Sequence, residues 1–304
     1  MHLIVPFAGV ASEAGRQALH DLPLPNLQRL LARLQPEAPD TGDELSLSPP
    51  HERALARALH WPVTDGRLPF AAQEAHAKGL PDAPWAWLTP VHLHVGTEQF
   101  TMTDPASLQL DEPASRELLD ALRPLLETEG FTLHWAAPQR WLAAHPMFDE
   151  LATASLDRVI GRNVDPWLPD QRAARLLRRL QNEVQMLLYT HPLNDRREAA
   201  GLSTVNSFWA SAGGRLPDRT AADAPVIDDR LRGPALAEDW VAWREAWAQL
   251  DGQVLAALAA TDPPRLTLAG ERSALTFTAQ PQGLWQRLSS SFKRPAPAAL
   301  LESL

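Results

Sequence analysis

The sequence predicts an α/β protein: a three-layer core interrupted by an inserted α/β lobe. Residues 2–8 are almost all apolar, which is typical of a central strand covered on both faces. Residues 111–129 and 170–189 carry leucines at helical spacing on one side, which predicts two amphipathic helices. At 304 residues and 45% hydrophobic content, the chain is long enough for a core with a lobe. We expect the core at residues 1–75 and 205–304 and the lobe at 76–204.

Further elements follow in order along the first half of the chain. Leucines at helical spacing after Pro25 predict a helix over residues 24–34. Pro49 and Pro50 predict the start of another helix. Residues 85–95 alternate in polarity and residues 131–135 are β-prone, so both ranges are predicted strands.

Residues 190–214 predict a short helix followed by a buried strand. Asn194 is expected to cap the helix, and Gly201 to end it. Residues 205–210 are apolar and β-prone. The small residues 211–214 then predict a loop at the carboxyl end of that strand, where α/β sheets bind ligands.

The last third predicts a loop, a helix, a hairpin and a tail. Residues 216–234 are rich in Asp, Arg and Pro and predict a surface loop. Residues 237–260 predict a helix whose tryptophans belong to the core. Residues 265–269 and 274–279 predict two strands around a turn, and the Ala/Pro-rich residues 293–304 a frayed end.

Composition excludes several classes of function. The net charge of −9 does not favour nucleic-acid binding, which requires a basic face. The chain has no cysteine, and therefore no disulfide, thiolate metal site or cysteine nucleophile. No apolar run reaches the ~20 residues that span a membrane, and the first residues lack a basic leader. We expect a soluble cytoplasmic protein with neither a membrane nor a nucleic-acid partner.

Two segments carry a family resemblance. One contains His191, Pro192, Asn194, Arg197, Gly201, Asn206 and Gly213-Gly214. It resembles the H-P-V-N-x-x-R-x-x-x-G segment of archaeal-type cofactor-independent phosphoglycerate mutases. Residues 25–30, PNLQRL, resemble the T-P-N-L-D-R-L of the wider alkaline phosphatase superfamily. The resemblance implies an alkaline-phosphatase-like core with a mutase-like lobe. Over its whole length, the chain also resembles the proteobacterial RpfE-type regulatory proteins.

The resemblance implies a serine nucleophile and two divalent cations, and here the chain departs from it. His51 matches a family histidine, but Leu47 stands at the nucleophile position, so Ser46 and Ser48 are the catalytic candidates. These serines can equally belong to a turn before the helix.

The chain also departs from the family at the metal ligands. Phe7-Ala8 and Glu271-Arg272 stand where the family has ligands, so we expect no metal cofactor. The alternative is manganese or zinc held by Glu271 or by His92 and His94, two residues apart on one strand face.

The resemblance also implies an anionic ligand. The residues expected to contact a phosphorylated or otherwise anionic small molecule are Arg140, Asp157, Arg158, Asn194, Arg197, Asn206 and Arg272. Arg272 is a fixed cation that can hold a phosphate by two hydrogen bonds. For residues 155–169 a solvated loop is the alternative.

Three hypotheses of function follow. The first is a degenerate, metal-less regulatory protein that binds an anion. The second is an active metal-dependent phosphoglycerate mutase or phosphatase. The third is a protein-interaction module with a vestigial pocket, whose partner the sequence does not identify.

Overall fold

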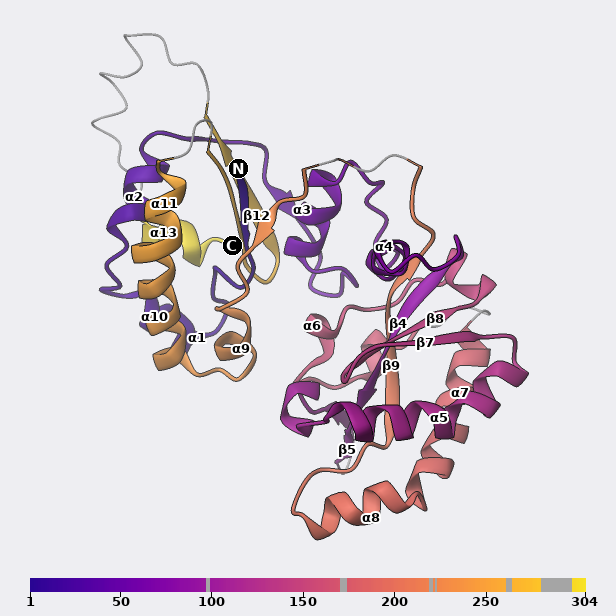
Figure 1. Cartoon of the computed structure of the whole chain (residues 1–304). Helices are drawn as coiled ribbons and strands as arrows, with labels where there is room; N and C mark the ends of the chain where they lie inside the picture. The colour runs from indigo at the N-terminus through magenta and orange to yellow at the C-terminus, as the bar shows by residue number, and fades with distance from the viewer. Residues whose placement is uncertain (97–98, 170–173, 219–220, 222, 261–263, 280–296) are drawn as a thin grey trace. The chain divides into compact units, whose positions relative to one another are not determined.

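The chain forms two compact units (Figure 1). The computed structural model describes all residues except 97–98, 170–173, 219–220, 222, 261–263 and 280–296. The first unit contains Met1–Glu44, Pro49–Pro62 and Arg219–Leu304, and the second contains Leu45–Ser48 and Val63–Asp218. Each unit has its own sheet and helices, so the expected α/β class is confirmed. Residues 63–75 and 205–218, expected in the core, lie in the second unit.

The sheet of the first unit has the strand order β10-β1-β11-β12-β2, and β3 also pairs with β12. Strands β1 (His2–Val5), β10 (Val226–Ile227) and β11 (Arg265–Ala269) are parallel. Strands β12 (Ser273–Thr278), β2 (Gln35–Pro36) and β3 (Asp40–Thr41) are antiparallel. Strand β1 is central, as its apolar run predicts, and Leu3, Ile4 and Val5 are fully buried.

Helices cover both faces of this sheet, which gives the three expected layers. Leu3 and Leu268 face a core built from α1 (Glu13–Leu19), α2 (Pro25–Leu31), α10 (Trp240–Gln249), the π-helix η4 (Leu250–Leu255) and α11 (Ala256–Leu258). Helix α9 (Arg232–Leu236) lies beside α10. The buried Asp251 carboxylate accepts hydrogen bonds from the backbone N–H groups of Asn26 and Leu27, so it satisfies the start of α2. Helix α3 (Pro50–Ala58) packs on the opposite face.

The second unit is built on an antiparallel sheet of order β7-β8-β4-β9. Its strands are β4 (Trp85–Val91), β7 (Thr132–Ala137), β8 (Arg140–Ala144) and β9 (Ser207–Gly214). Helices α5 (Glu112–Thr128) and α7 (Ala174–Tyr189) bury their leucines on one face, and α4 (Phe70–Ala77) covers the other. A hairpin of β5 (Leu93–Val95) and β6 (Phe100–Met102) and the helices α6 (Leu156–Val159) and α8 (Pro192–Ala199) complete the unit, with the 3₁₀ turns Pro105–Leu108, Pro146–Asp149 and Asp165–Trp167.

Three expected loops contain regular structure. Residues 211–214 are the last part of β9, because small side chains also fit a strand paired with β4. Residues 155–169 contain α6 and a 3₁₀ turn. Within 216–234, β10 pairs with β1 through only two residues, too few for a periodic pattern.

The expected cap of α8 is also wrong. His191 is the N-cap, and its ring accepts a hydrogen bond from the Leu193 N–H; Asn194 lies inside the helix. Gly201 follows the end of α8 with φ at 71°, so its predicted role is confirmed. The expected cap of α7, Asp170, lies outside the described residues.

The prediction of a frayed end is wrong for residues 297–304. Helix α13 (Pro297–Glu302) places Leu301 and Leu304 in the core of the first unit. Gly9 and Gly270, which follow β1 and β11, make room for them: a Cβ on Gly270 would lie 2.6 Å from the Leu304 Cβ. The Leu304 main-chain oxygen accepts hydrogen bonds from the N–H groups of Arg272 and Ser273. This segment therefore occupies the carboxyl edge of the sheet.

Candidate functional site

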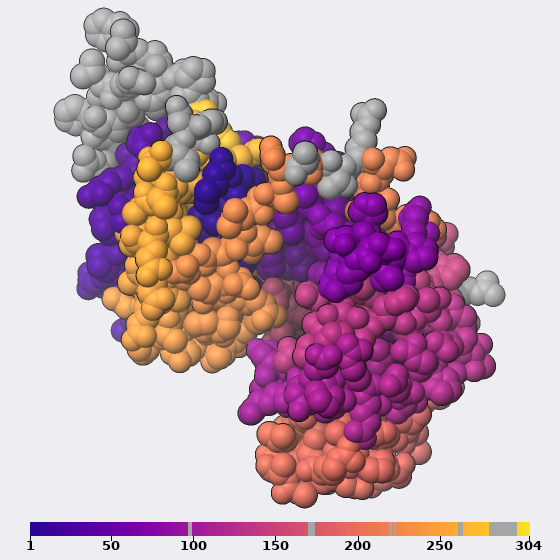
Figure 2. All heavy atoms as spheres, in the orientation of Figure 1, coloured from indigo at the N-terminus to yellow at the C-terminus, as the bar shows by residue number. Residues whose placement is uncertain are grey.

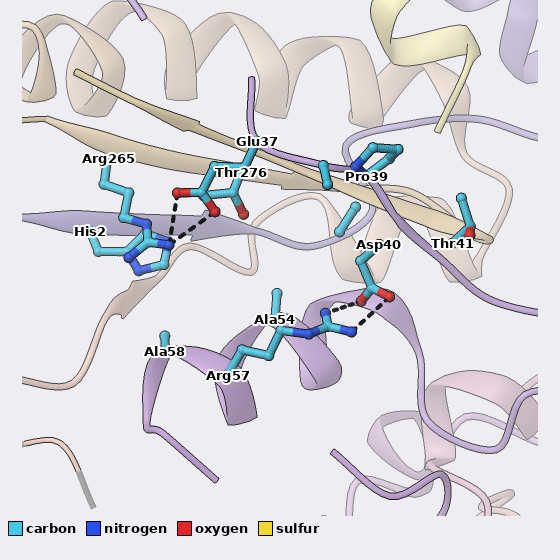
Figure 3. A pocket seen from close by; sticks show the side chains of 12 residues that line it. His2, Glu37, Pro39, Asp40, Thr41, Ala54, Arg57, Ala58, Arg265 and Thr276 are labelled. Atoms are coloured by element: carbon cyan, nitrogen blue, oxygen red, sulfur yellow. Dashed lines mark hydrogen bonds and ion pairs between the residues drawn. The ribbon is translucent and has the colours of Figure 1, made fainter. Parts of the chain in front are cut away.

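A pocket of about 400 Å³ lies between α3 and the sheet of the first unit (Figure 3). Side chains alternate along a strand, so Leu3 and Leu268 face the core while His2, Arg265 and Thr276 face α3. Pairing brings them together, since His2 lies opposite Arg265 in the β1–β11 register. The polar lining is His2, Glu37, Asp40, Thr41, Arg57, Arg265 and Thr276. His2 and Arg265 begin the parallel strands, so the pocket lies at the amino edge of the sheet.

His2 is held in its neutral form. Its Nε2 atom lies 2.8 Å from the Thr267 hydroxyl, which lies 2.9 Å from the Thr276 hydroxyl. Burial, followed by the charges of Arg265 and of the N-terminal amino group, lowers the pKa of His2 from 6.5 to about 4. Near neutral pH the imidazole is therefore an uncharged hydrogen-bonding group.

A tight ion pair forms a second wall of the pocket. Arg57 donates to both Asp40 oxygens, at 2.5 and 3.0 Å, and the Arg53 Nε atom lies 3.1 Å from the same carboxylate. Burial alone would raise the pKa of Asp40, but the hydrogen bonds and charges of the two arginines lower it overall. The hydrogen bond to Asp40 raises the pKa of Arg57. Asp40 and Arg57 therefore both stay ionised.

The third cation of the site is Arg265. Its Nη2 atom lies 3.1 and 3.2 Å from the two oxygens of Glu37. The Arg57 and Arg265 side chains are 49% and 44% exposed, so parts of both guanidinium groups face water. The charged side chains that line the pocket are therefore Arg57 and Arg265 together with Asp40 and Glu37. The two guanidinium groups are planar donors that suit a carboxylate or phosphate.

Comparisons with known proteins find several solved structures that match this chain at low sequence identity. No family model and no curated protein sequence matches the chain. A cofactor-independent phosphoglycerate mutase from Thermoplasma acidophilum is 12% identical with a TM-score of 0.37, over 93% of this chain and 90% of that one. The PH0037 protein from Pyrococcus horikoshii is 13% identical with a TM-score of 0.42, over 91% and 86%. At these values neither structure assigns a ligand or a reaction to this chain.

Three residues expected to bind the anion hold the backbone of the second unit. Asn194 is buried, and its amide nitrogen donates to the Leu188 and Val205 carbonyls while its oxygen accepts from the Val205 N–H. Arg197 is buried and donates to the Ser203 and Leu108 carbonyls. Asn206 pairs with the N–H and C=O of Leu93. These side chains therefore stabilise the second unit by hydrogen-bonding to backbone groups of neighbouring segments.

The other expected ligand contacts are spread over both units. Arg140 forms an ion pair with Glu74 at 3.2 Å and lies over the Trp87 ring. Arg272, in the first unit, forms an exposed ion pair with Glu44. Asp157 and the buried Arg158 lie in α6 of the second unit. Asn194 and Asn206 line one pocket of the second unit.

The catalytic candidates also belong to different units. Ser46 and Ser48 lie in the second unit and His51 in the first. Ser48 is buried, and its hydroxyl accepts a hydrogen bond from the Gly66 N–H. The ring of His51 packs 5.6 Å from that of Phe7.

The metal candidates do not form a cluster. The Nδ1 atom of His92 lies 2.9 Å from the Thr204 carbonyl oxygen. His94 is exposed on β5, and Glu271 lies in the first unit. Within the described ranges, no three Asp, Glu or His side chains are placed to hold a metal ion. Nor is any described helix both long and apolar enough for a bilayer.

Sequence reasoning missed His2, Asp40, Arg57 and Arg265. Arg57 reads as a solvated helix residue and His2 as part of an apolar strand. His2 and Arg265 meet through the pairing of β1 with β11, which are more than 250 residues apart, and Arg57 joins them because α3 packs on this sheet. The one usable signal was alternation, because His2 and Arg265 each begin a strand whose other outward positions are uncharged.

Proposed function

We propose that this protein binds a small anionic molecule, bearing a phosphate or carboxylate group, in the pocket between α3 and the sheet. The guanidinium groups of Arg57 and Arg265, which line the pocket and are partly exposed to water, carry this proposal. An entering anion would accept hydrogen bonds from the water-facing sides of Arg57 and Arg265. His2, which is neutral near pH 7, would add a hydrogen bond but no charge.

We further propose that binding is not followed by phosphoryl transfer and serves a regulatory role. The support comes from the sequence, since Phe7-Ala8 and Glu271-Arg272 replace the ligands that a two-metal mechanism needs. The resemblance to the RpfE-type proteins supports the regulatory role.

Calorimetry on the full chain tests the binding step. Inorganic phosphate, 3-phosphoglycerate and citrate are titrated into the native protein and into Arg265→Gln. We expect at least one anion to bind, and the variant to bind it about tenfold more weakly, as for the loss of one charge-assisted contact. Arg29→Gln, an exposed change on α2, is the control and should bind normally. Absence of heat with all three anions at millimolar concentration would refute the proposal.

A coupled assay tests the absence of chemistry. The chain is incubated with manganese or zinc and 3-phosphoglycerate, and 2-phosphoglycerate and free phosphate are measured. We expect neither product above the rate without protein. Metal-dependent formation of either one, lost in His51→Ala, would show an active enzyme instead.

A further inference from the structure

A second pocket, of about 710 Å³, lies in the second unit between α7, α8 and the β5–β6 hairpin. Two of its apolar lining residues are exposed: Val95 is 60% and Tyr189 83% accessible. Residues of α8, which lies at the protein surface (Figure 2), form one wall. Exposed apolar side chains around a concave site are typical of an interaction surface.

The backbone of β5 is open beside this pocket. His92 and Gly96 hydrogen-bond across the hairpin, to Thr103 and Gln99. By the alternation of an antiparallel pair, the N–H and C=O groups of Leu93 and Val95 point away from β6. The side-chain amide of Asn206 forms hydrogen bonds with the N–H and C=O groups of Leu93, as a neighbouring strand would. Within the part of the chain that the structure describes, no group forms such hydrogen bonds with Val95.

Two carboxylates on the α8 side of this pocket indicate what kind of molecule fits it. Asp195 and Glu198 are the charged residues that line this pocket, and both are exposed. Among the described residues neither forms an ion pair, because the neighbouring Arg196 is paired with Glu117 and Arg197 is buried. A negative wall beside an apolar rim complements a segment with a Lys or Arg next to an apolar side chain.

We propose that this pocket binds an extended peptide segment of a partner protein, which adds a strand to β5. The peptide backbone pairs with the N–H and C=O of Val95. An apolar side chain of the peptide packs between Val95 and Tyr189, and a basic side chain reaches Asp195 and Glu198. This site lies in the second unit and is independent of the anion pocket.

Selection from a random peptide library tests the proposal without assuming a partner. A phage library of random nine-residue peptides is selected on the immobilised full chain, and the best peptides are measured by fluorescence polarisation. We expect sequences with an apolar and a basic residue two positions apart, because side chains at i and i+2 of an added strand face the same side. Binding should be about tenfold weaker to Asp195→Asn/Glu198→Gln, and weaker in higher salt. Asp218→Asn, a carboxylate outside the pocket, is the matched control and should leave affinity unchanged.

Backbone pairing has its own readout. The selected peptide is also made with single N-methyl groups along its backbone; methylation at one or more alternate positions should weaken binding at least tenfold. In ¹⁵N-valine-labelled protein, the Val95 amide signal, assigned through Val95→Ile, should shift on binding. The proposal is overturned if no selected peptide depends on Asp195 and Glu198, or if N-methylation at every position and the Val95 signal show no effect.

Discussion

His2 shows how a single side chain ties the anion pocket to pH. Its pKa is about 4 in the folded protein and 6.5 as the ordinary value, so only the unfolded chain takes up this proton between those pH values. The contribution of His2 to the free energy of unfolding is therefore constant above pH 6.5 and falls as the pH decreases toward 4.

We predict that His2→Asn has a weaker acid dependence than the native chain. Urea unfolding at pH 7, 6, 5 and 4.5 should show the stability of the native protein falling relative to the variant across this range. Other groups titrate in both proteins and cancel in the difference. A constant difference between the two proteins would mean that His2 is protonated equally in both states.

Asn194 is a second informative residue, because all its side-chain hydrogen bonds go to the backbone. Asn194→Ala would leave the Leu188 and Val205 groups buried without partners. We predict a loss of about 3 kcal/mol in the free energy of unfolding. Asp195→Ala, the next residue and exposed, should change it by less than about 0.5 kcal/mol. Chemical denaturation measures both, and equal effects would contradict the role of Asn194 as a brace.

At this scale the sequence identified residue types better than roles. Asn194, Arg197 and Asn206 stood out because they match a family motif, which implied contacts with an anion. Their partners are backbone carbonyl and N–H groups, some nearby in the sequence, such as Leu188 and Ser203, and some distant, such as Leu108 and Leu93. Conversely, nothing in the sequence around Arg57 and Arg265 marks them as site residues, and they line one pocket because α3 packs on the sheet that contains β11.

Among the elements, α13 and the residues after it pack closely against Gly9 and Gly270. Gly270 has no room for a side chain, since a Cβ would lie 2.6 Å from Leu304. We predict that Gly270→Ala lowers the free energy of unfolding by about 1–3 kcal/mol through overpacking. Gly252→Ala, at an open position of the helical segment after α10, should instead stabilise by up to about 1 kcal/mol.

A double-mutant cycle isolates the contact between Gly270 and α13. In a chain that lacks residues 297–304, Gly270→Ala should have almost no effect, because the atoms it meets are absent. Thermal unfolding of the four proteins gives the coupling. An equal cost with and without α13 would place the strain elsewhere.

Long elements followed from the sequence, and short ones did not. The periodic leucines of α5 and α7 and the tryptophans of α10 predicted these helices correctly, since their packing repeats over several turns. Strands β2, β3 and β10 have two residues each and exist only through their neighbours. β9 extends through its glycines because β4 supplies the pairing.

At the scale of the molecule, each of the two units has its own hydrophobic core. Leu268 belongs to the core of the first unit and Leu88 to that of the second, and both are fully buried. We predict that Leu268→Ala costs about 2–5 kcal/mol and reduces amide-exchange protection in β1 and β11 but not in β4. Leu88→Ala should do the reverse. If each change reduced protection in both sheets equally, the units would form one cooperative system.

Strand β1 has a consequence for biosynthesis. Its two partners, β10 and β11, begin at Val226 and Arg265 and are made long after it leaves the ribosome. Residues 63–218 emerge in between, and their own sheet needs nothing from the late part of the chain. During synthesis the apolar strand β1 therefore stays unpaired while residues 63–218 fold. We expect chaperones that shield emerging apolar segments to bind β1 during this time.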